Sequence, residues 1–157
     1  MSGLFDDLRD LYQEVILDHG RKPRNYRRLD DANLTARGDN PMCGDRMELF
    51  VKTAPDGTIQ QAAFQGRGCA ISMASASLMT ETVQGKSPDQ AREMAEKFRT
   101  LAMTGTCPDC GEPIAEDMER LAPLSGVHEF PSRVKCATLA WHTLNAALDG
   151  AKEASSE

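Results

Sequence analysis

The chain has 157 residues, 40% of them hydrophobic, which is enough for one packed domain and short for two, so we expect a single domain over residues 1–157. No apolar run approaches the roughly 20 residues that a membrane span needs, and residues 1–10 carry acids where a secretory signal would carry bases, so we expect a cytoplasmic protein that does not bind a membrane. With 18 basic and 24 acidic residues the net charge is −6, which disfavours a nucleic-acid ligand.

The first predicted element is an amphipathic helix over residues 5–19. Apolar residues recur there at helical spacing, and Gly20 and Pro23 end the pattern. Five basic residues follow within positions 21–28, with one tyrosine among them. Because aromatic residues are only 5% of the chain, a base-stacking surface is not expected, and a solvated linker is the simpler interpretation of this run.

A small sheet is predicted next. A short edge strand fits residues 34–37, and the alternation of apolar and polar residues from Met47 to Lys52 predicts a half-buried strand. Residues 54–57 have the composition of a turn, and residues 58–64 are predicted to return as the second strand of a hairpin.

Helices dominate the second half of the chain. They are predicted over residues 69–83, 89–103, 115–121 and 131–148, and the tail over 149–157 is expected to fray. Strands that cluster early and helices that cluster late indicate an α+β fold, with a small antiparallel sheet of about three strands and helices packed on one of its faces.

Three cysteines are the candidates for chemistry. Cys43 and Asp45 flank a glycine that can adopt positive φ and turn both side chains toward one point. Cys69 follows two glycines at a predicted helix start, and Cys136 follows Arg133 and Lys135. The helix end and the flanking bases are expected to lower the thiol pKa values and so favour the thiolate form, which binds metal and attacks sulfur.

If Cys43, Asp45, Cys69 and Cys136 converge, they would hold a divalent ion. Zinc is the expected ion, because it accepts sulfur and oxygen ligands in a tetrahedron. An aspartate ligand is unusual in a closed structural zinc site, so we expect this site to exchange or react. The alternative is that the three cysteines are unrelated small apolar residues.

The same residues carry a resemblance to a known family. The segments concerned are Asp18-His19 with Pro23-Arg24-Asn25, Asn40-Pro41-x-Cys43-Gly44-Asp45, Gly66-x-Gly68-Cys69-x-Ile71-Ser72, and Phe130-Pro131-x-Arg133-x-Lys135-Cys136. Together they resemble the U-type iron–sulfur assembly proteins. Lys135, where IscU-type proteins have a histidine, and an insertion between the second and third cysteines make the SufU branch the nearer match.

The resemblance implies zinc bound by Cys43, Asp45, Cys69 and Cys136. It also implies that Cys43 accepts sulfane sulfur from a SufS-type cysteine desulfurase, whose histidine would take over one zinc position. Arg133 is the residue expected to support the persulfide or the charge of the site. The expected activity is thus that of a zinc-dependent sulfurtransferase, which passes sulfur to a downstream scaffold or apo-protein and is a monomer or weak oligomer.

Two other functions stay open. The thiolates could instead hold an iron–sulfur cluster that is built on this protein and passed on, with Asp45 making the cluster labile. A zinc-stabilised interaction module without chemistry of its own is the other alternative. Spacing offers no serine elbow or acid–base pair typical of a hydrolase.

The remaining cysteines and histidines are not expected to join the site. Cys107-Pro108-Asp109-Cys110 resembles half of a zinc knuckle, and it could be a redox dithiol, a half-site completed by another chain, or a local clasp. His19, His128 and His142 are expected to be packing, capping or surface residues.

Overall fold

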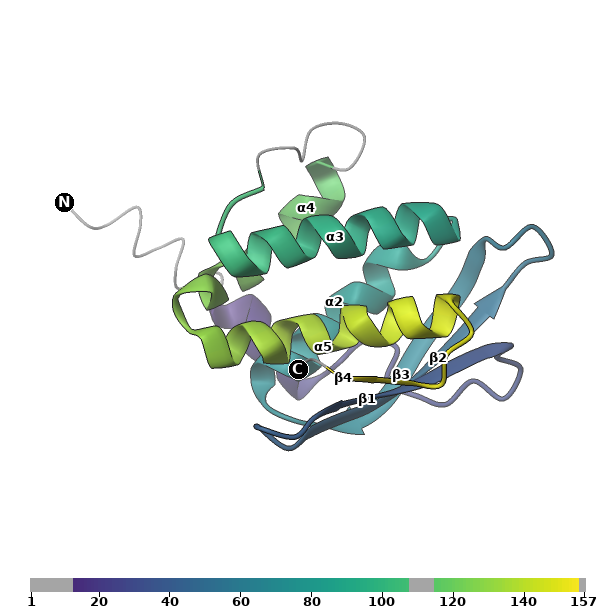
Figure 1. Cartoon of the computed structure of the whole chain (residues 1–157), viewed down its shortest axis with the longest axis horizontal. Coiled ribbons are helices and arrows are strands. Elements are labelled where there is room, and N and C mark those ends of the chain that lie inside the picture. The colour runs from purple at the N-terminus through teal and green to yellow at the C-terminus, as the bar shows by residue number, and fades with distance from the viewer. Residues whose placement is uncertain (1–12, 108–114, 156–157) are drawn as a thin grey trace.

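The computed structural model describes residues 13–107 and 115–155. The described elements form two layers, with a twisted sheet on one side and the helices stacked against one of its faces (Figure 1). The predicted α+β class is therefore confirmed. The start of the first predicted helix lies outside the described residues, and the described part of that helix covers residues 13–21.

The sheet has the strand order β3-β2-β1-β4. Strands β1, β2 and β3 form an antiparallel meander in which Asn40 pairs with Asp45 and Arg46 pairs with Arg67. Because of this register, the turn after β1 and the last residue of β3 lie at the same end of the strands. The strands are β1 Leu34–Asn40, β2 Asp45–Thr53, β3 Ile59–Arg67 and β4 Glu153–Ser155.

Strand β4 corrects the prediction of a frayed tail. After α5 the chain reverses at Gly150, whose φ is 79°, and residues 153–155 pair in parallel with β1. Arg92 secures the reversal through a 2.9 Å hydrogen bond to the Asp149 carboxylate. Three residues are too few to show an alternating pattern, so the free edge of β1 rather than local sequence creates this strand.

The helices begin and end close to the predicted positions. Ser87 and Gln90 form a capping box at the start of α3, and Gly105 ends that helix in the left-handed conformation with φ 83°. The elements are α2 Ala70–Val83, α3 Pro88–Thr104, α4 Ala115–Leu121, the 3-10 segment η1 Ala122–Glu129 and α5 Pro131–Leu148.

Helices α2 and α5 form the centre of the core. Small residues along α2 allow α5 to approach closely, and the Ser75 hydroxyl donates to the Ala137 carbonyl between the two helices at 2.5 Å. Both helices pack on the inner face of the sheet, while Phe98 of α3 stacks on Trp141 of α5 with ring centroids 5.1 Å apart. This packing fixes the start of α2 and the first half of α5 relative to the sheet edge.

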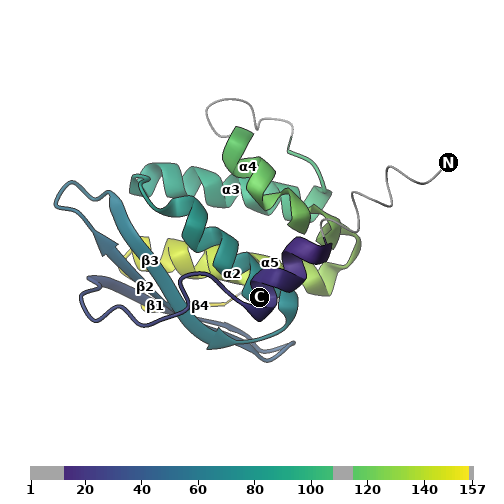
Figure 2. The ribbon, with the colours of Figure 1, turned by 180° about the vertical axis from the view of Figure 1, so that it is seen from behind.

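The basic run is part of a loop that passes along the β3 edge of the sheet (Figure 2), where the Phe64 N–H donates to the Asn25 carbonyl at 3.0 Å. Tyr26 lies edge-on to Phe64, and the Arg28 guanidinium lies 5.6 Å from the centre of the Phe50 ring. Arg24 pairs with Asp18 at 2.6 Å. These contacts make the run a packed connection rather than a continuous cationic stripe.

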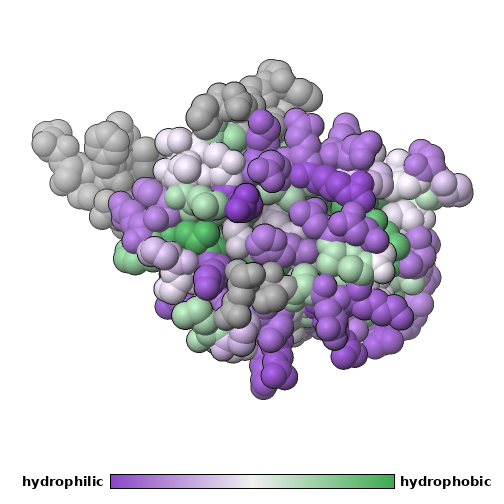
Figure 3. Space-filling view, viewed as in Figure 1, coloured by the Kyte–Doolittle hydropathy of each residue, from purple (hydrophilic) through white to green (hydrophobic). Residues whose placement is uncertain are grey.

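None of the helices that the structure describes is long and apolar enough to span a bilayer. Hydrophilic side chains dominate the face over α3 and α5 (Figure 3).

His19 ties the first helix to α2. Its Nδ1 lies 2.7 Å from the Ser77 hydroxyl, which also accepts the Arg24 backbone N–H at 2.8 Å. Only 9% of His19 is exposed. Burial and, less strongly, the charge of Arg24 lower the pKa of His19, while Glu81 and Asp18 oppose the shift.

We therefore expect the His19 contribution to folding stability to be pH-dependent. A lowered pKa means that the folded protein binds fewer protons than the unfolded chain, so this contribution is full above about pH 6.5 and is lost as the pH falls through the folded-state value. Urea unfolding from pH 8 to 5 should show wild type losing stability relative to His19→Gln, with a slope of at most about 1.4 kcal/mol per pH unit. Parallel pH profiles would contradict the assignment.

Candidate metal centre

The β1–β2 turn, the β3–α2 connection and the first half of α5 meet at one end of the sheet. Cys43 lies in the turn between β1 and β2, and Asp45 is the first residue of β2. Cys69 is the N-cap of α2, directly after β3, and Cys136 faces this end from the second turn of α5. Residues far apart in sequence are thereby gathered at one end of the molecule.

The sulfurs of Cys43 and Cys136 and a carboxylate oxygen of Asp45 all lie within 4.8 Å of one another. This spacing and the sulfur and oxygen donors are consistent with a metal site. Asp45 is only 1% exposed and Cys136 is 0% exposed, whereas Cys43 is exposed. A bound cation would offset the cost of burying a carboxylate and a thiolate together.

Cys69, the fourth predicted ligand, borders this cluster without belonging to the set within 4.8 Å. Its backbone N–H donates to Asp45 Oδ1 at 3.1 Å, and its sulfur accepts the Ser72 backbone N–H at 3.5 Å. Arg133 also lies beside the thiols: the charge of Cys69, followed by a hydrogen bond to Cys136 and the charge of Cys136, raises the pKa of its guanidinium.

The pKa of Cys136 does not follow the sequence-based expectation. Burial, followed by hydrogen bonding to Asp45 and Cys43 and by the charge of Cys69, raises the pKa of Cys136 strongly. The prediction that flanking bases would lower it is wrong for this residue, because Cys136 lies inside the core and beside other acidic groups. A cation bound at the cluster would stabilise the thiolate form of Cys136.

Two glycines shape the cluster. Gly44 has φ 72°, as predicted, and this turn places Cys43 and Asp45 on the same site. At Gly68, a Cβ atom would lie 2.6 Å from Asp45 Oδ1 and would also clash with the Ser72 hydroxyl. The missing side chain at position 68 therefore makes room for the carboxylate.

We expect Gly68→Ala to displace the Asp45 carboxylate and to weaken metal binding by about 10- to 100-fold, the usual effect of disturbing a ligand's support. Competition with a metal-binding dye would measure the affinity. Gly126→Ala is the matched control, because a Cβ there meets nothing within 4 Å. Equal affinity in both variants would show that Gly68 does not shape the site.

Asn40 is a residue of the site that sequence reasoning did not assign. Its side-chain NH2 group donates to Asp45 Oδ2 at 3.2 Å and to Cys136 Sγ at 3.7 Å, and the residue is 0% exposed. The only sequence signal was its position at the start of the Asn40–Asp45 motif.

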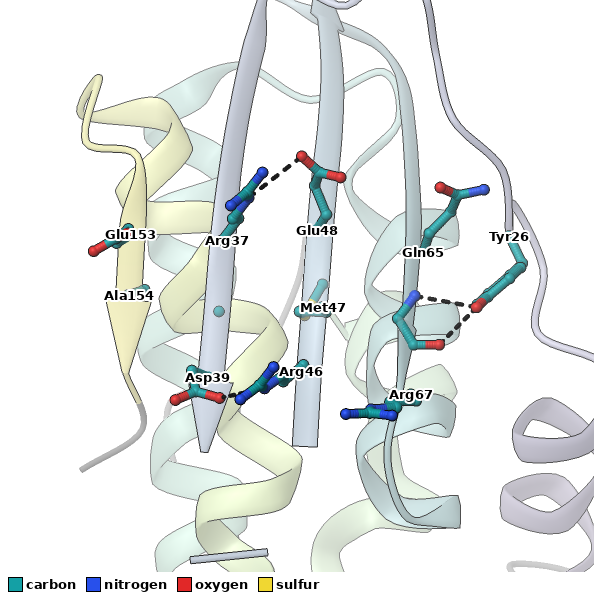
Figure 4. A pocket seen from close by; sticks show the side chains of 12 residues that line it. Tyr26, Arg37, Asp39, Arg46, Met47, Glu48, Gln65, Arg67, Glu153 and Ala154 are labelled. Atoms are coloured by element: carbon teal, nitrogen blue, oxygen red, sulfur yellow. Dashed lines mark hydrogen bonds and ion pairs between the residues drawn. The ribbon is translucent and has the colours of Figure 1, made fainter. Parts of the chain in front are cut away.

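The outer face of the sheet carries a cavity of about 930 Å³ that contains none of the three thiols (Figure 4). Two of its arginines face carboxylates across the strands: Arg37 lies 3.7 Å from Glu48, and Arg46 lies 3.5 Å from Asp39. Because its charges are largely matched, this cavity does not offer the chemistry of the thiol cluster.

In the described part of the chain, no histidine joins a cluster of possible metal ligands. His19 contacts Ser77, and His128 Nδ1 lies 2.8 Å from the Ser125 carbonyl oxygen. The alternatives for Cys107 and Cys110 stay predictions, because Cys110 lies outside the described residues.

The fold and the cluster define a class: an α+β domain with thiols and one carboxylate gathered at the end of its sheet. The sequence profile of the family described as NifU-like N terminal domain matches residues 11–154. The chain belongs to this family and is an iron–sulfur cluster assembly protein of the SufU/IscU type.

Two curated relatives are about equally similar. The zinc-dependent sulfurtransferase SufU of Bacillus subtilis (strain 168) is 40% identical over 138 residues, which is 88% of this chain and 89% of that protein. The iron–sulfur cluster assembly scaffold protein IscU of Streptococcus pyogenes serotype M1 is 38% identical over 141 residues, or 90% and 84% of the two chains.

A solved structure supports the same grouping. The crystal structure of a proposed cluster assembly scaffold protein for the SUF system from Fervidobacterium islandicum AW-1 is similar, with TM-score 0.77 and 32% identity. The match covers 86% of this chain and 94% of the other.

Proposed function

We propose that this protein is a zinc-dependent sulfur acceptor, in which Cys43 takes persulfide sulfur from a cysteine desulfurase. The observation that carries the proposal is an asymmetry in the cluster. Asp45, Cys69 and Cys136 each receive at least one N–H hydrogen bond, and two of the three are buried. Cys43 is exposed, and no N–H group of the described residues donates to its sulfur.

Cys43, Asp45, Cys69 and Cys136 are the residues that would hold zinc. A bound zinc ion would supply positive charge that keeps the thiols deprotonated at neutral pH. Cys43 is the ligand best placed to leave, because it lies at the surface and no N–H group of the described residues donates to its sulfur, unlike the other three donors.

In the transfer step, the Cys43 thiolate attacks the outer sulfur of the desulfurase persulfide. A new S–S bond forms on Cys43, the S–S bond of the desulfurase breaks, and the desulfurase cysteine leaves as a thiolate. Sulfur therefore moves without net oxidation or reduction. Arg133, beside Cys69 and Cys136, offers a guanidinium that offsets the negative charge of the persulfide.

The surroundings of Cys43 support access by a protein partner. Met42, the neighbour of Cys43 in the turn, is 66% exposed, so apolar surface borders the site. The Lys135 ammonium lies 3.4 Å from Met42 Sδ and adds a positive charge at this border. The name of the B. subtilis relative, a zinc-dependent sulfurtransferase, agrees with a role in sulfur transfer.

The second candidate is a scaffold on which an iron–sulfur cluster is assembled. The same thiols and Asp45 could ligate iron, and the S. pyogenes relative, whose name is that of a scaffold, is nearly as similar as SufU. We favour sulfur acceptance because Lys135, next to Cys136, cannot ligate iron as the histidine of IscU-type proteins would.

One set of measurements separates the two. Metal analysis of the purified protein should find about one zinc per chain, and a SufS-type desulfurase should turn over faster when the protein is added. A brown chromophore after anaerobic reconstitution, transferable to an apo-ferredoxin and without stimulation of the desulfurase, would instead establish the scaffold.

A further inference from the structure

Asn40 occupies an unusual position at the cluster. It is the last residue of β1, pairs with Asp45 across the sheet, and is completely buried. Its backbone carbonyl accepts the N–H groups of Cys43 at 3.3 Å and Gly44 at 2.9 Å. The backbone of this one residue thus holds the turn that carries Cys43.

The side chain of Asn40 acts on two other members of the cluster. One carboxamide nitrogen reaches both Asp45 Oδ2 and Cys136 Sγ, at 3.2 and 3.7 Å. The Asp45 carboxylate can only accept, and the Cys136 thiol donates to the Ser132 carbonyl at 3.5 Å, which leaves its sulfur as an acceptor. The amide therefore presents its NH2 group to both, and this chemistry fixes its orientation. The amide oxygen is buried without a hydrogen-bond partner among the described residues.

The unpaired oxygen indicates what determines the amide's position. A buried carbonyl without a partner costs stability, so an asparagine chosen only for packing or fold stability is a poor choice here. The two hydrogen bonds that its NH2 group donates to Asp45 and Cys136 therefore explain why an asparagine stands at this position.

Asp45 is held from both sides as a result. Cys69 N–H donates to Oδ1 and Asn40 donates to Oδ2, so the carboxylate cannot rotate without breaking a hydrogen bond. Cys136 is secured by the same amide, whereas no side chain of the described residues donates an N–H group to Cys43 Sγ. The Asn40 amide therefore holds Asp45 and Cys136 by hydrogen bonds but not Cys43, which is the ligand that must exchange in the proposed function.

We propose that Asn40 is a positioning residue that determines which thiol leaves the metal. By holding Asp45 and Cys136 in place, its carboxamide confines exchange to Cys43. This inference rests on the metal site of the proposed function, but it concerns the order of exchange rather than the transfer of sulfur.

The test compares two substitutions that separate hydrogen bonding from packing. Asn40→Ala removes the side chain, whereas Asn40→Asp keeps its shape and replaces the donor by an acceptor. Asn145→Ala is the matched control, because Asn145 is a half-buried asparagine of α5 whose amide oxygen is also buried and unpaired, but it lies outside the site. Zinc-loaded proteins are treated with limiting iodoacetamide, and mass spectrometry identifies the alkylated cysteine.

In wild type and Asn145→Ala, Cys43 should be alkylated at least about tenfold faster than Cys136. The reason is that Cys136 is supported by the Asn40 hydrogen bond and Cys43 is not. Both Asn40 variants should lose this preference, and their cobalt-loaded forms should show shifted thiolate-to-metal absorption bands. Retained preference for Cys43 in Asn40→Asp would overturn the proposal, since packing alone would then suffice.

A measurement on wild type keeps the proposal testable if both Asn40 variants fail to fold. In a nuclear magnetic resonance spectrum, the Asn40 side-chain NH2 protons should exchange slowly with solvent and shift when zinc binds. Fast exchange without a shift would overturn the inference.

The two proposals fail separately. An altered alkylation order in the Asn40 variants, in a protein that does not stimulate the desulfurase, would support the positioning role and refute sulfur acceptance. Stimulation that depends on Cys43, combined with an unaltered order, would refute the positioning role alone.

Discussion

Replacing Cys43 with alanine is expected to reduce desulfurase turnover to the rate of the desulfurase alone. The substitution removes the exposed thiol of the site, whereas Cys69 is half-buried and the buried Cys136 cannot reach a partner's persulfide. Turnover is measured by sulfide or alanine production. In parallel, mass spectrometry should find one added sulfur atom on Cys43 of the wild type and none on the variant.

The control for this experiment is Met42→Ala. Met42 is the exposed neighbour of Cys43, so its truncation alters the docking surface but keeps the thiol. We expect Met42→Ala to raise the protein concentration needed for half-maximal stimulation and to leave the maximal rate close to that of wild type. If Cys43→Ala stimulated the desulfurase as well as wild type does, Cys43 would not be the acceptor.

Removal of the metal is expected to have the largest effect on stability. Without a cation, the fold buries Asp45 and Cys136 next to one another, and folding must then keep both groups uncharged or tolerate their repulsion. A ligand present at about 1,000 times its dissociation constant stabilises the folded state by about 4 kcal/mol. For a chain of this size that corresponds to a fall in melting temperature of about 8–16 °C on chelation.

Calorimetry or circular dichroism with and without a strong chelator would measure this difference. The control is the double variant Cys43→Ala with Asp45→Ala, which lacks two donors of the cluster and should melt at the same temperature in both conditions. An unchanged melting temperature of metal-loaded wild type after proven zinc removal would show that the site is not coupled to folding.

The elements of the fold were largely predictable because their signals are local. The period-2 pattern around Met47 predicted β2, and Pro88 and Pro131 placed the starts of α3 and α5 to within a residue. Strand β4 was missed because its partner is the distant edge of β1. The cysteine motifs were also visible, since residue type and spacing are properties of the chain itself.

The asymmetry of the cluster was not predictable. Asn40 and Cys136 are 96 positions apart, and only the packing of α5 against the sheet brings the amide to the thiol. The same packing buries Cys136 and reverses the effect that its basic neighbours were expected to have on its pKa. It also leaves Cys43 at the surface, although the motif gives no sign of which thiol is exposed.

The sequence by itself determined the main helices, the β1–β3 meander and the residue types that could bind a metal, because these depend on short-range patterns. Only the tertiary structure decided which donors are buried, which are held by hydrogen bonds and which one faces solvent. The physical reason is that desolvation and hydrogen-bond geometry depend on atoms contributed by distant parts of the chain.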